Sequence, residues 1–589
     1  QPLQAGLGGN HSPRTGYKRC GTRMMAAADA MFERGNALAD ARCAVNIREE
    51  YGWSCASQGA VTVWFKGRID GIDAASLAQR FAQERPSATA VGDLLASVIG
   101  HFAICATGPG WAFAAVDWVR SIPLAAAKID RCWVIDDRPD RLRQRAGLGA
   151  ANLAPDAALA IGMAGYTIDD AALYRGMQLL VPGELAFFED GTIRRHRYYI
   201  YRPWQVRPAS SESLESELKD LTLHLIERML GNLEGRTLVI PLSAGRDSRL
   251  IASAAKHLGY KNVRCFTYGR AGNFEARASR TIAERLGYRW TFVPATIGKQ
   301  REFFASTDYE RYVDFADDGC SLPFVQDMAP LMELKASGYV PDDAVIVNGN
   351  SGDFITGNHV PESMWLPGAA LSDDERWQRI IDALLKKHFS LWRSLATPDN
   401  NARISALLRS SIARAGGALG DPRSDHGLYE YAEFQDRQCR YVITGQRIYE
   451  FLGHDWRLPL WDNDYLRFWE GVPLAEKIGQ GLYARMLAKA NWGGVWQDVP
   501  VNRKTVRPLS IIPLRLAAKA LHAPFGRDRW HRFERRYFQY WLDATCNSAC
   551  VPYQRVLRDT RGARHHIAWL AELYLARHGV ALDHLSAQV

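Results

Sequence analysis

The sequence lacks any run of about 20 apolar residues, which is the length that a helix needs to cross a membrane. Its first residues are glycine-rich and polar without an apolar core, so we expect no secretory signal peptide there. The ten cysteines are scattered, and the closest pair, Cys546 and Cys550, has no second Cys/His pair to complete a zinc site. We therefore expect a cytoplasmic chain in a reducing compartment, with no disulfide framework.

Two further signatures are missing. No Lys/Arg run with interleaved aromatic residues marks a nucleic-acid groove, so a nucleic-acid partner is not expected. The Gly-Lys-Ser/Thr end of a Walker phosphate loop is also absent. The formal net charge of +9 either favours anionic ligands such as nucleotides or reflects an arginine-rich solvated surface.

A chain of 589 residues is too long for one core, so we expect two or three domains. Residues 1–45 are expected to be a leader or poorly ordered segment, in which native translation begins at Met24 or Met25. Glycine- and proline-broken β runs with two short helices predict an α+β domain over residues 46–205. The proline- and serine-rich stretch 201–216 is typical of a linker.

The pattern of predicted helices and strands changes from residue 214 onward. Helices of 10–14 residues alternate with short apolar strands, which favours a parallel sheet built from βαβ units. After about Ser372 the sequence is mostly helical and rich in Trp, Tyr and Arg. We therefore predict an α/β domain over residues 214–589 whose C-terminal part is helical.

One stretch of this second domain carries specific chemistry. In "RTLVIPLSAGRDSRLIASAAKHLGY" (236–260) an apolar strand runs into Ser243, Gly245, Asp247 and Ser248 and then into an amphipathic helix. Backbone N–H groups at a helix N-terminus bind phosphate oxygens, two hydroxyls add donors, and the carboxylate can hold Mg²⁺. A simple helix cap would use the same residue types and is the alternative.

Four motifs of the chain, taken in order, carry a resemblance to a known family. "LSAGRDSR" resembles the Ser-Gly-Gly-x-Asp-Ser pyrophosphate loop of the asparagine synthetase family of N-type ATP pyrophosphatases, with Ala244 where the family usually has glycine. "AVIVNGNSGDFITGNHVP" (344–361) resembles the second nucleotide motif of that family. "GHDWRLPLWD" (453–462) resembles its Glu-x-Arg-x-Pro-Phe-Leu-Asp stretch, and "VNRKTVRP" (501–508) stands where the family has an essential lysine.

The resemblance implies a fold and a set of ligands. The fold is α/β: an N-terminal α+β sandwich like that of N-terminal-nucleophile hydrolases, followed by a parallel-sheet ATP-pyrophosphatase domain. The ligands are ATP and Mg²⁺, which Asp247 and Asp353 would share. Lys504, assisted by Arg503, would neutralise the α-phosphate region. The nucleotide would also meet Leu242, Ser243, Gly245, Ser248, Phe266, Gly349, Ser351 and Gly352.

Some positions depart from the family pattern. Asn350 stands where asparagine synthetases carry glutamate and β-lactam synthetases tyrosine, so aspartate is doubtful as the substrate. A glutaminase of this family needs cysteine as its first residue, because the free α-amine is the base. This chain begins with Gln1, Cys20 precedes a helical pattern, and Lys66 replaces the oxyanion-hole asparagine. We predict a degenerate glutaminase domain kept for packing or substrate presentation.

The function implied is an ATP-dependent, AMP-forming ligase that adenylates a carboxylate and transfers ammonia or an amine to it. Among relatives, the chain most resembles proteins encoded with bacterial surface-polysaccharide genes, so a uronic acid is the predicted substrate, and a separate glutaminase is a potential partner. The alternatives are a ring-closing synthetase, like lasso-peptide cyclases and β-lactam synthetases, and a non-catalytic nucleotide-binding scaffold. Four aromatic residues, predicted either to stack on sugars or to fill the core, are Trp456, Trp461, Tyr465 and Trp469.

Overall fold

The computed structural model describes residues 43–366, 368, 370–501 and 509–585. The predicted catalytic cations Arg503 and Lys504 lie outside these residues, as do Gln1 and Cys20. No helix in the described ranges combines the length and the apolar character that crossing a bilayer requires.

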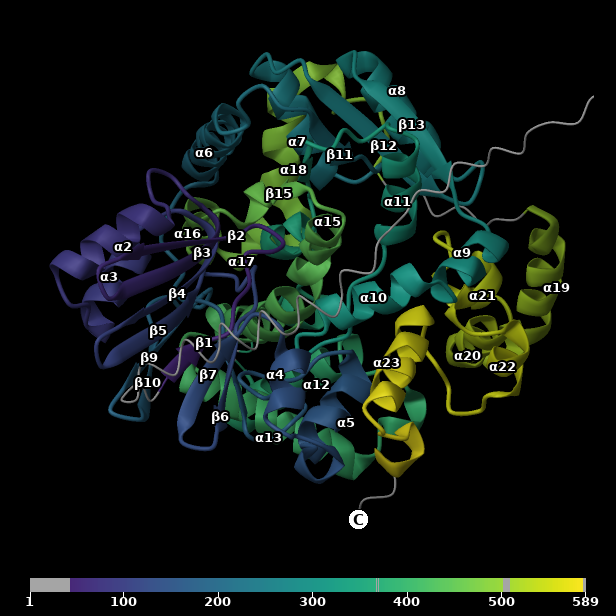
Figure 1. Ribbon diagram of the computed structural model, residues 1–589. Helices are drawn as coiled ribbons and strands as arrows, with labels where there is room; N and C mark the ends of the chain where they lie inside the picture. The colour runs from purple at the N-terminus through teal and green to yellow at the C-terminus, as the bar shows by residue number, and fades with distance from the viewer. Residues whose placement is uncertain (1–42, 367, 369, 502–508, 586–589) are drawn as a thin grey trace, which may run out of the picture.

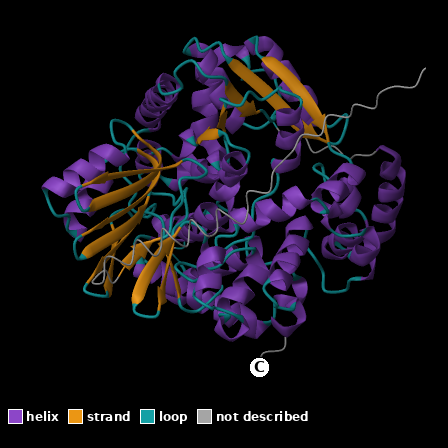
Figure 2. Ribbon diagram, in the orientation of Figure 1, coloured by secondary structure: helices purple, strands orange, loops and turns teal. Residues whose placement is uncertain are grey.

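The N-terminal part is a sandwich of two sheets with helices on its outer faces (Figures 1 and 2). Its larger sheet is antiparallel, in the order β10-β9-β5-β4-β3-β2, and its smaller sheet has the order β1-β7-β6-β8. The bounds are β1 Cys43–Val45, β2 Trp53–Gln58, β3 Val61–Ile69, α2 Ala74–Gln83, α3 Ala88–Ser97, β4 Gly100–Gly108, β5 Trp111–Val116, β6 Ala125–Ile129, β7 Cys132–Asp136, α4 Pro139–Arg145, α5 Pro155–Ala164, β8 Met177–Leu179, β9 Glu184–Glu189 and β10 Thr192–Arg197.

Strand β5 shows why the sandwich closes. All six of its residues are buried, because one sheet face packs on α2 and α3 and the other on the small sheet. Phe113 meets the Phe81 ring of α2 at 5.5 Å, while Ala114 points to the opposite core. Leu142 of α4 packs with Ala127 and Val134 on the outer side of the small sheet. The layers therefore run helix, sheet, sheet, helix, as the α+β prediction expects.

The second part is built on a five-stranded parallel sheet. It follows α6 (Ser211–Gly231), whose first turn is capped by the Ser210 hydroxyl. Its order is β13-β12-β11-β14-β15, with bounds β11 Leu238–Pro241, β12 Val263–Gly269, β13 Arg289–Pro294, β14 Val345–Val347 and β15 Asp455–Arg457, and α7 (Asp247–His257) and α8 (Phe274–Leu286) connect the first three. The chain steps outward from β11 and then returns to its other side, so the strand order reverses between β11 and β14. Ligands of open parallel sheets bind at such a reversal, beyond the carboxyl ends of the strands.

The rest of the chain is mostly helical, as predicted. These helices lie at the centre, at the bottom and along the right side of Figure 1. Their bounds are α9 Ile297–Phe304, α10 Thr307–Ala316, α11 Met328–Ala336, α12 Asp373–Lys387, α13 Pro398–Arg414, α14 Asp425–Ala432, α15 Arg447–Phe451, α16 Asn463–Glu470, α17 Leu474–Lys477, α18 Gly481–Ala490, α19 Ile512–His522, α20 Arg527–Tyr537, α21 Gln539–Leu542, α22 Tyr553–Arg558 and α23 His566–Arg577.

One expectation is corrected by the fold, and two groups of side chains are placed by it. The last three residues of the predicted leader, 43–45, form β1 and pair in parallel with β7. Asp455 is ion-paired with Arg236, and Asp462 with Arg228. The aromatic group is core: Trp461, Tyr465 and Trp469 are buried, and the buried Trp456 borders a cavity.

Candidate active site

The loop between β11 and α7 is organised by its own hydroxyl groups. The Ser243 N–H donates to Ser248 Oγ at 3.0 Å, and the Gly245 N–H donates to Ser243 Oγ at 3.0 Å. The two hydroxyl oxygens lie 3.1 Å apart. Since Asp247 is the first residue of α7, the loop brings two hydroxyls and a carboxylate to the N-terminus of a helix, as predicted.

Arg249, a buried residue that the sequence did not single out, supports this loop through hydrogen bonds to backbone carbonyls. Arg249 donates to the Ala244 carbonyl at 2.8 Å, to Val499 at 2.8 Å, and to Val495 and Pro500 at 3.2 Å. Burial, and next the nearby Arg246, lower the pKa of Arg249 to about 10. The chain up to Pro500 is thereby held against the loop. The signal was its place directly after "GRDS", but its acceptors lie too far along the chain to be foreseen.

The loop after β14 touches the β11 loop at two glycines. A Cβ on Gly349 would lie 2.8 Å from Ser248 N, and a Cβ on Gly352 would lie 2.5 Å from Asp247 Cγ. Only a residue without a side chain fits either place. The Asp353 N–H then donates to Asp247 Oδ2 at 3.0 Å. The two sequence motifs, about a hundred residues apart, therefore meet at the reversal of the strand order.

Asp247 and Asp353 lie close enough to perturb one another. Burial, and next the negative charge of Asp353, raise the pKa of Asp247 to about 7. Burial alone would raise the pKa of Asp353, but the hydrogen bond and charge of His359 lower it. The Asp353 side chain is 45% exposed, so it faces solvent.

The pair fits a divalent cation bound together with phosphates. The described part of the chain contains no group of three or more His, Cys, Asp or Glu side chains arranged so that they could hold a metal ion by themselves. Mg²⁺ needs no such cluster, because it binds through one or two carboxylates and completes its shell with substrate phosphates and water. A cation would also relieve the repulsion that raises the pKa of Asp247.

His359 fixes Asp353 and was not singled out from the sequence. Its Nε2 lies 3.1 Å from Asp353 Oδ2, and its Nδ1 hydrogen-bonds to Glu433. Burial alone would lower the pKa of His359, but the charge of Glu433 and hydrogen bonds to both carboxylates raise it. Glu433 is buried and also accepts from His388 at 2.9 Å and Gln438 at 3.0 Å. His359 lies inside the quoted second motif, so its position was visible although its role was not.

The other predicted nucleotide contacts gather at the same edge. Leu242, at the end of β11, donates its N–H to the Phe266 carbonyl of β12 at 2.8 Å, while Gly349 follows β14 on the other side. Ser351 has a positive φ of 67° and donates to Gln438 Oε1 at 2.5 Å. Because the Leu242 and Phe266 side chains are buried, only their backbone can frame a nucleoside.

Asn350 is held by hydrogen bonds of its backbone. Its N–H donates to Asn348 Oδ1 at 2.7 Å, and its carbonyl accepts from Trp461 Nε1 at 3.1 Å. The structure thus places Asn350 beside the predicted nucleotide loop. Its role toward a substrate stays a prediction.

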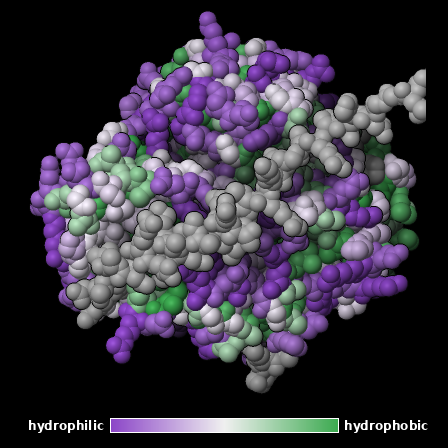
Figure 3. Space-filling view, in the orientation of Figure 1, coloured by the Kyte–Doolittle hydropathy of each residue, from purple (hydrophilic) through white to green (hydrophobic). Residues whose placement is uncertain are grey.

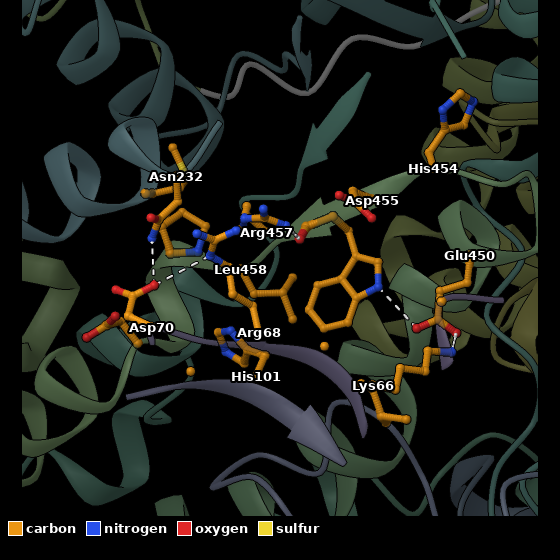
Figure 4. Close-up of a pocket in the computed structure, with 18 of the residues that line it drawn as sticks. Lys66, Arg68, Asp70, His101, Asn232, Glu450, His454, Asp455, Arg457 and Leu458 are labelled. Carbon is orange, nitrogen blue, oxygen red and sulfur yellow. Dashed lines mark hydrogen bonds and ion pairs between the residues drawn. The ribbon is translucent and has the colours of Figure 1, made fainter. Parts of the chain in front are cut away.

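Lys66, the residue at the predicted oxyanion position, is used differently. Its Nζ lies 2.8 Å from Glu450 Oε2, and both side chains are buried. Burial lowers the pKa of Lys66, and the charge of Glu450 opposes that shift. The pair borders a cavity of about 520 Å³ between the sandwich and β15, where His101, Trp456 and Arg457 also lie (Figure 4). Lys66 is therefore an ionic tie between the two parts of the chain.

Residues 234–505 match the family model described as asparagine synthase. Over these residues the chain is similar to asparagine synthases. The match spans the first three motifs and the first five residues of the fourth, and similarity to this family implies an ATP-dependent ligase that forms amide bonds. No curated protein matches the chain.

Two solved structures show weak likeness. One is the allosteric regulatory enzyme of purine biosynthesis, with 12% identity over 40% of this chain and 61% of its own, at a TM-score of 0.17. The other is glutamine phosphoribosylpyrophosphate amidotransferase from B. subtilis, complexed with ADP and GMP, with 13% identity over 40% of this chain and 72% of its own, at a TM-score of 0.17. The chain thus spans less than two thirds of the first structure, and TM-scores this low support no argument about either part of it.

Proposed function

We propose that this chain activates a carboxylate by adenylation and then converts it into an amide. The observation that carries the proposal is the contact between the β11 and β14 loops, which brings Asp247 and Asp353 together at a helix N-terminus. Two carboxylates beside free backbone N–H groups suit a polyphosphate with its cation. The asparagine synthase match over residues 234–505 supports the same reaction class.

In the first step a carboxylate oxygen attacks the α-phosphorus of ATP, and the bond to the bridging oxygen breaks so that pyrophosphate leaves. Negative charge gathers on the leaving group, so positioned donors stabilise the transition state. Here those donors are the N–H groups at the start of α7 and the hydroxyls of Ser243 and Ser248. Asp247 and Asp353 would hold Mg²⁺, which supplies positive charge to the phosphates.

In the second step an amine attacks the acyl carbon of the acyl-adenylate, and AMP leaves. We propose that Lys504 and Arg503 serve the α-phosphate in both steps. Support comes from Arg249, which holds the chain at Val499 and Pro500 against the phosphate loop.

For the substrate we propose a uronic acid carried on a nucleotide or lipid-linked glycan in bacterial surface-polysaccharide biosynthesis. The support is the sequence resemblance and Asn350, which offers an amide where relatives that use aspartate offer a carboxylate. Sugar hydroxyls pair well with an amide, which both donates and accepts hydrogen bonds. The ring-closing synthetase is the alternative enzyme, and the non-catalytic scaffold is the alternative from another class.

We also propose that the sandwich is not a working glutaminase. The ammonium group of Lys66 is ion-paired with the buried Glu450. Lys66 therefore does not offer a developing oxyanion the neutral amide donor that asparagine would supply. The nitrogen would then come from free ammonia, from an amine on the substrate, or from a separate glutaminase.

The test is ATP–pyrophosphate exchange across uronic acids, nucleotide-linked uronates, aspartate and a peptide acid, with and without ammonium. Each assay includes Asp247→Asn and, as a matched control, Asp342→Asn, whose side chain is 95% exposed before β14. We expect exchange with one carboxylate, a fall of at least about 100-fold in Asp247→Asn, and no change in the control. Exchange followed by ammonium-independent amide formation would favour ring closure.

Two results would contradict adenylation. The first is exchange that persists in Asp247→Asn. The second is ATP binding in the absence of any exchange, any carboxylate-dependent AMP and any amide product, whichever carboxylate is supplied. That result is expected of the scaffold.

A further inference from the structure

Helix α19 exposes its apolar side chains. In the part of the chain that the structure describes, none of its residues is buried. Leu514, Leu516 and Leu521 are 65%, 56% and 73% exposed, and Phe525 in the following turn is 58% exposed. Figure 3 shows this apolar surface at the right edge, over α19.

The polar side of α19 faces the protein instead. Arg515 Nε donates to Glu534 Oε1 at 2.7 Å, and its guanidinium lies 5.6 Å from the Trp530 ring. The His522 ring lies 4.2 Å from that of Phe533. A surface helix of a globular protein normally does the reverse, burying leucines and solvating cations. Leu514 and Leu521 are seven residues apart and so share the outward face.

Helix α20 adds positive charge beside these leucines. Arg527, Arg529, Arg532 and Arg535 are exposed and form no ion pair with any residue that the structure describes. The Arg529 guanidinium lies 4.4 Å from the Phe525 ring, which links the apolar and basic sides. Over Leu509–Tyr537 the acids are Asp528 and Glu534, and Glu534 already pairs with Arg515.

We propose that this surface, formed by Leu514, Leu521, Phe525 and the four arginines of α20, docks on an anionic phospholipid bilayer. An apolar helix face flanked by cations lies in the boundary between headgroups and acyl chains, where leucines leave water and guanidinium groups meet phosphates. The unneutralised charge selects an anionic surface over a neutral one. The inference does not depend on the proposed catalytic activity, because none of these residues lies in the candidate active site.

The experiment is co-sedimentation of the full chain with phosphatidylcholine vesicles, with and without phosphatidylglycerol, at low and high salt. We expect binding to the anionic vesicles and weakening by salt. The paired substitutions Leu514→Gln/Leu521→Gln and Arg529→Glu/Arg532→Glu should each lower binding about tenfold or more. Leu366→Gln, at a leucine that is 77% exposed elsewhere, is the matched control and should bind as the unchanged chain does.

Three outcomes would overturn the proposal: no binding to anionic vesicles, equal binding to neutral ones, or unchanged binding by both paired variants. Light scattering of the same samples without vesicles tests the rival occupant. Self-association that the leucine variant abolishes would assign the surface to a second copy of the chain. Circular dichroism of each variant establishes that it is folded, which these exposed positions should permit.

Discussion

Asp436 shows at the residue scale how a buried carboxylate links stability to pH. Its Oδ1 accepts the Asp169 N–H at 2.7 Å, while its Oδ2 is buried without a hydrogen-bond partner in the described chain. Burial, opposed mainly by Arg440, raises the pKa of Asp436 to about 7. The folded chain therefore holds a proton between about pH 4 and pH 7 that the unfolded chain releases.

From this it follows that Asp436 lowers the free energy of unfolding as pH rises through that window, by about 1.4 kcal/mol per pH unit. We expect Asp436→Asn to remove this slope. The free energy of unfolding of the variant should therefore rise relative to that of the unchanged chain between about pH 5 and pH 6.5. Urea unfolding of both proteins across these pH values measures the difference. A difference independent of pH would show that the carboxyl group keeps an ordinary pKa.

His359 is the residue on which the geometry of Asp353 depends. Replacing His359 by alanine removes the hydrogen bond to the Asp353 side chain and one partner of the buried Glu433. We therefore expect a loss of about 1–3 kcal/mol in unfolding free energy. In the exchange assay we expect the Mg²⁺ concentration at half-maximal rate to rise. His359→Gln, which retains one donor, should show a smaller effect on both. Equal Mg²⁺ dependence in all three proteins would limit His359 to a packing role.

At the scale of elements, the approach of the β14 loop to α7 fixes the site. Gly352→Ala would place a Cβ 2.5 Å from Asp247 Cγ, so one loop must move away. We expect exchange to fall at least about tenfold, since misplacement of about 1 Å has large effects on positioned groups. Gly231→Ala, whose Cβ would meet nothing within 4 Å, is the control and should leave exchange unchanged. Full exchange in Gly352→Ala would contradict a site formed by this contact.

How far the sequence predicts these elements depends on how local their signals are. The strand, the loop and the helix over residues 236–260 follow from adjacent residues, and the structure confirms this order of elements. The β6–β7 hairpin was not foreseen, because its alanine-rich first strand has no alternating pattern. The contacts of His359 with Glu433 and of Arg249 with Val499 join segments far apart in sequence, and no local pattern encodes such pairs.

At the scale of the whole molecule, the buried pair Lys66–Glu450 joins the sandwich to the part of the chain that is built on the parallel sheet. Lys66→Met would leave Glu450 with Arg447 at 3.2 Å and Trp456 Nε1 at 3.1 Å. We expect a loss of about 1–3 kcal/mol, less than for a carboxylate left with no partner. Glu450→Gln and the double variant complete a cycle, measured by urea unfolding. Additive effects would show that the two side chains do not interact. Glutamine hydrolysis by the unchanged chain would contradict a degenerate glutaminase.

Arg249 also sets how far the domain extends along the chain. One guanidinium is shared by the Ala244 carbonyl and by three carbonyls between Val495 and Pro500, so the phosphate loop is shaped by residues about 250 positions further on. A fragment that stopped before Val495 would retain every strand of the parallel sheet and still leave this cation underpaired in the interior. The smallest autonomous unit of the domain is therefore defined by the hydrogen bonds that the buried guanidinium needs. It ends after Pro500 rather than at the last strand.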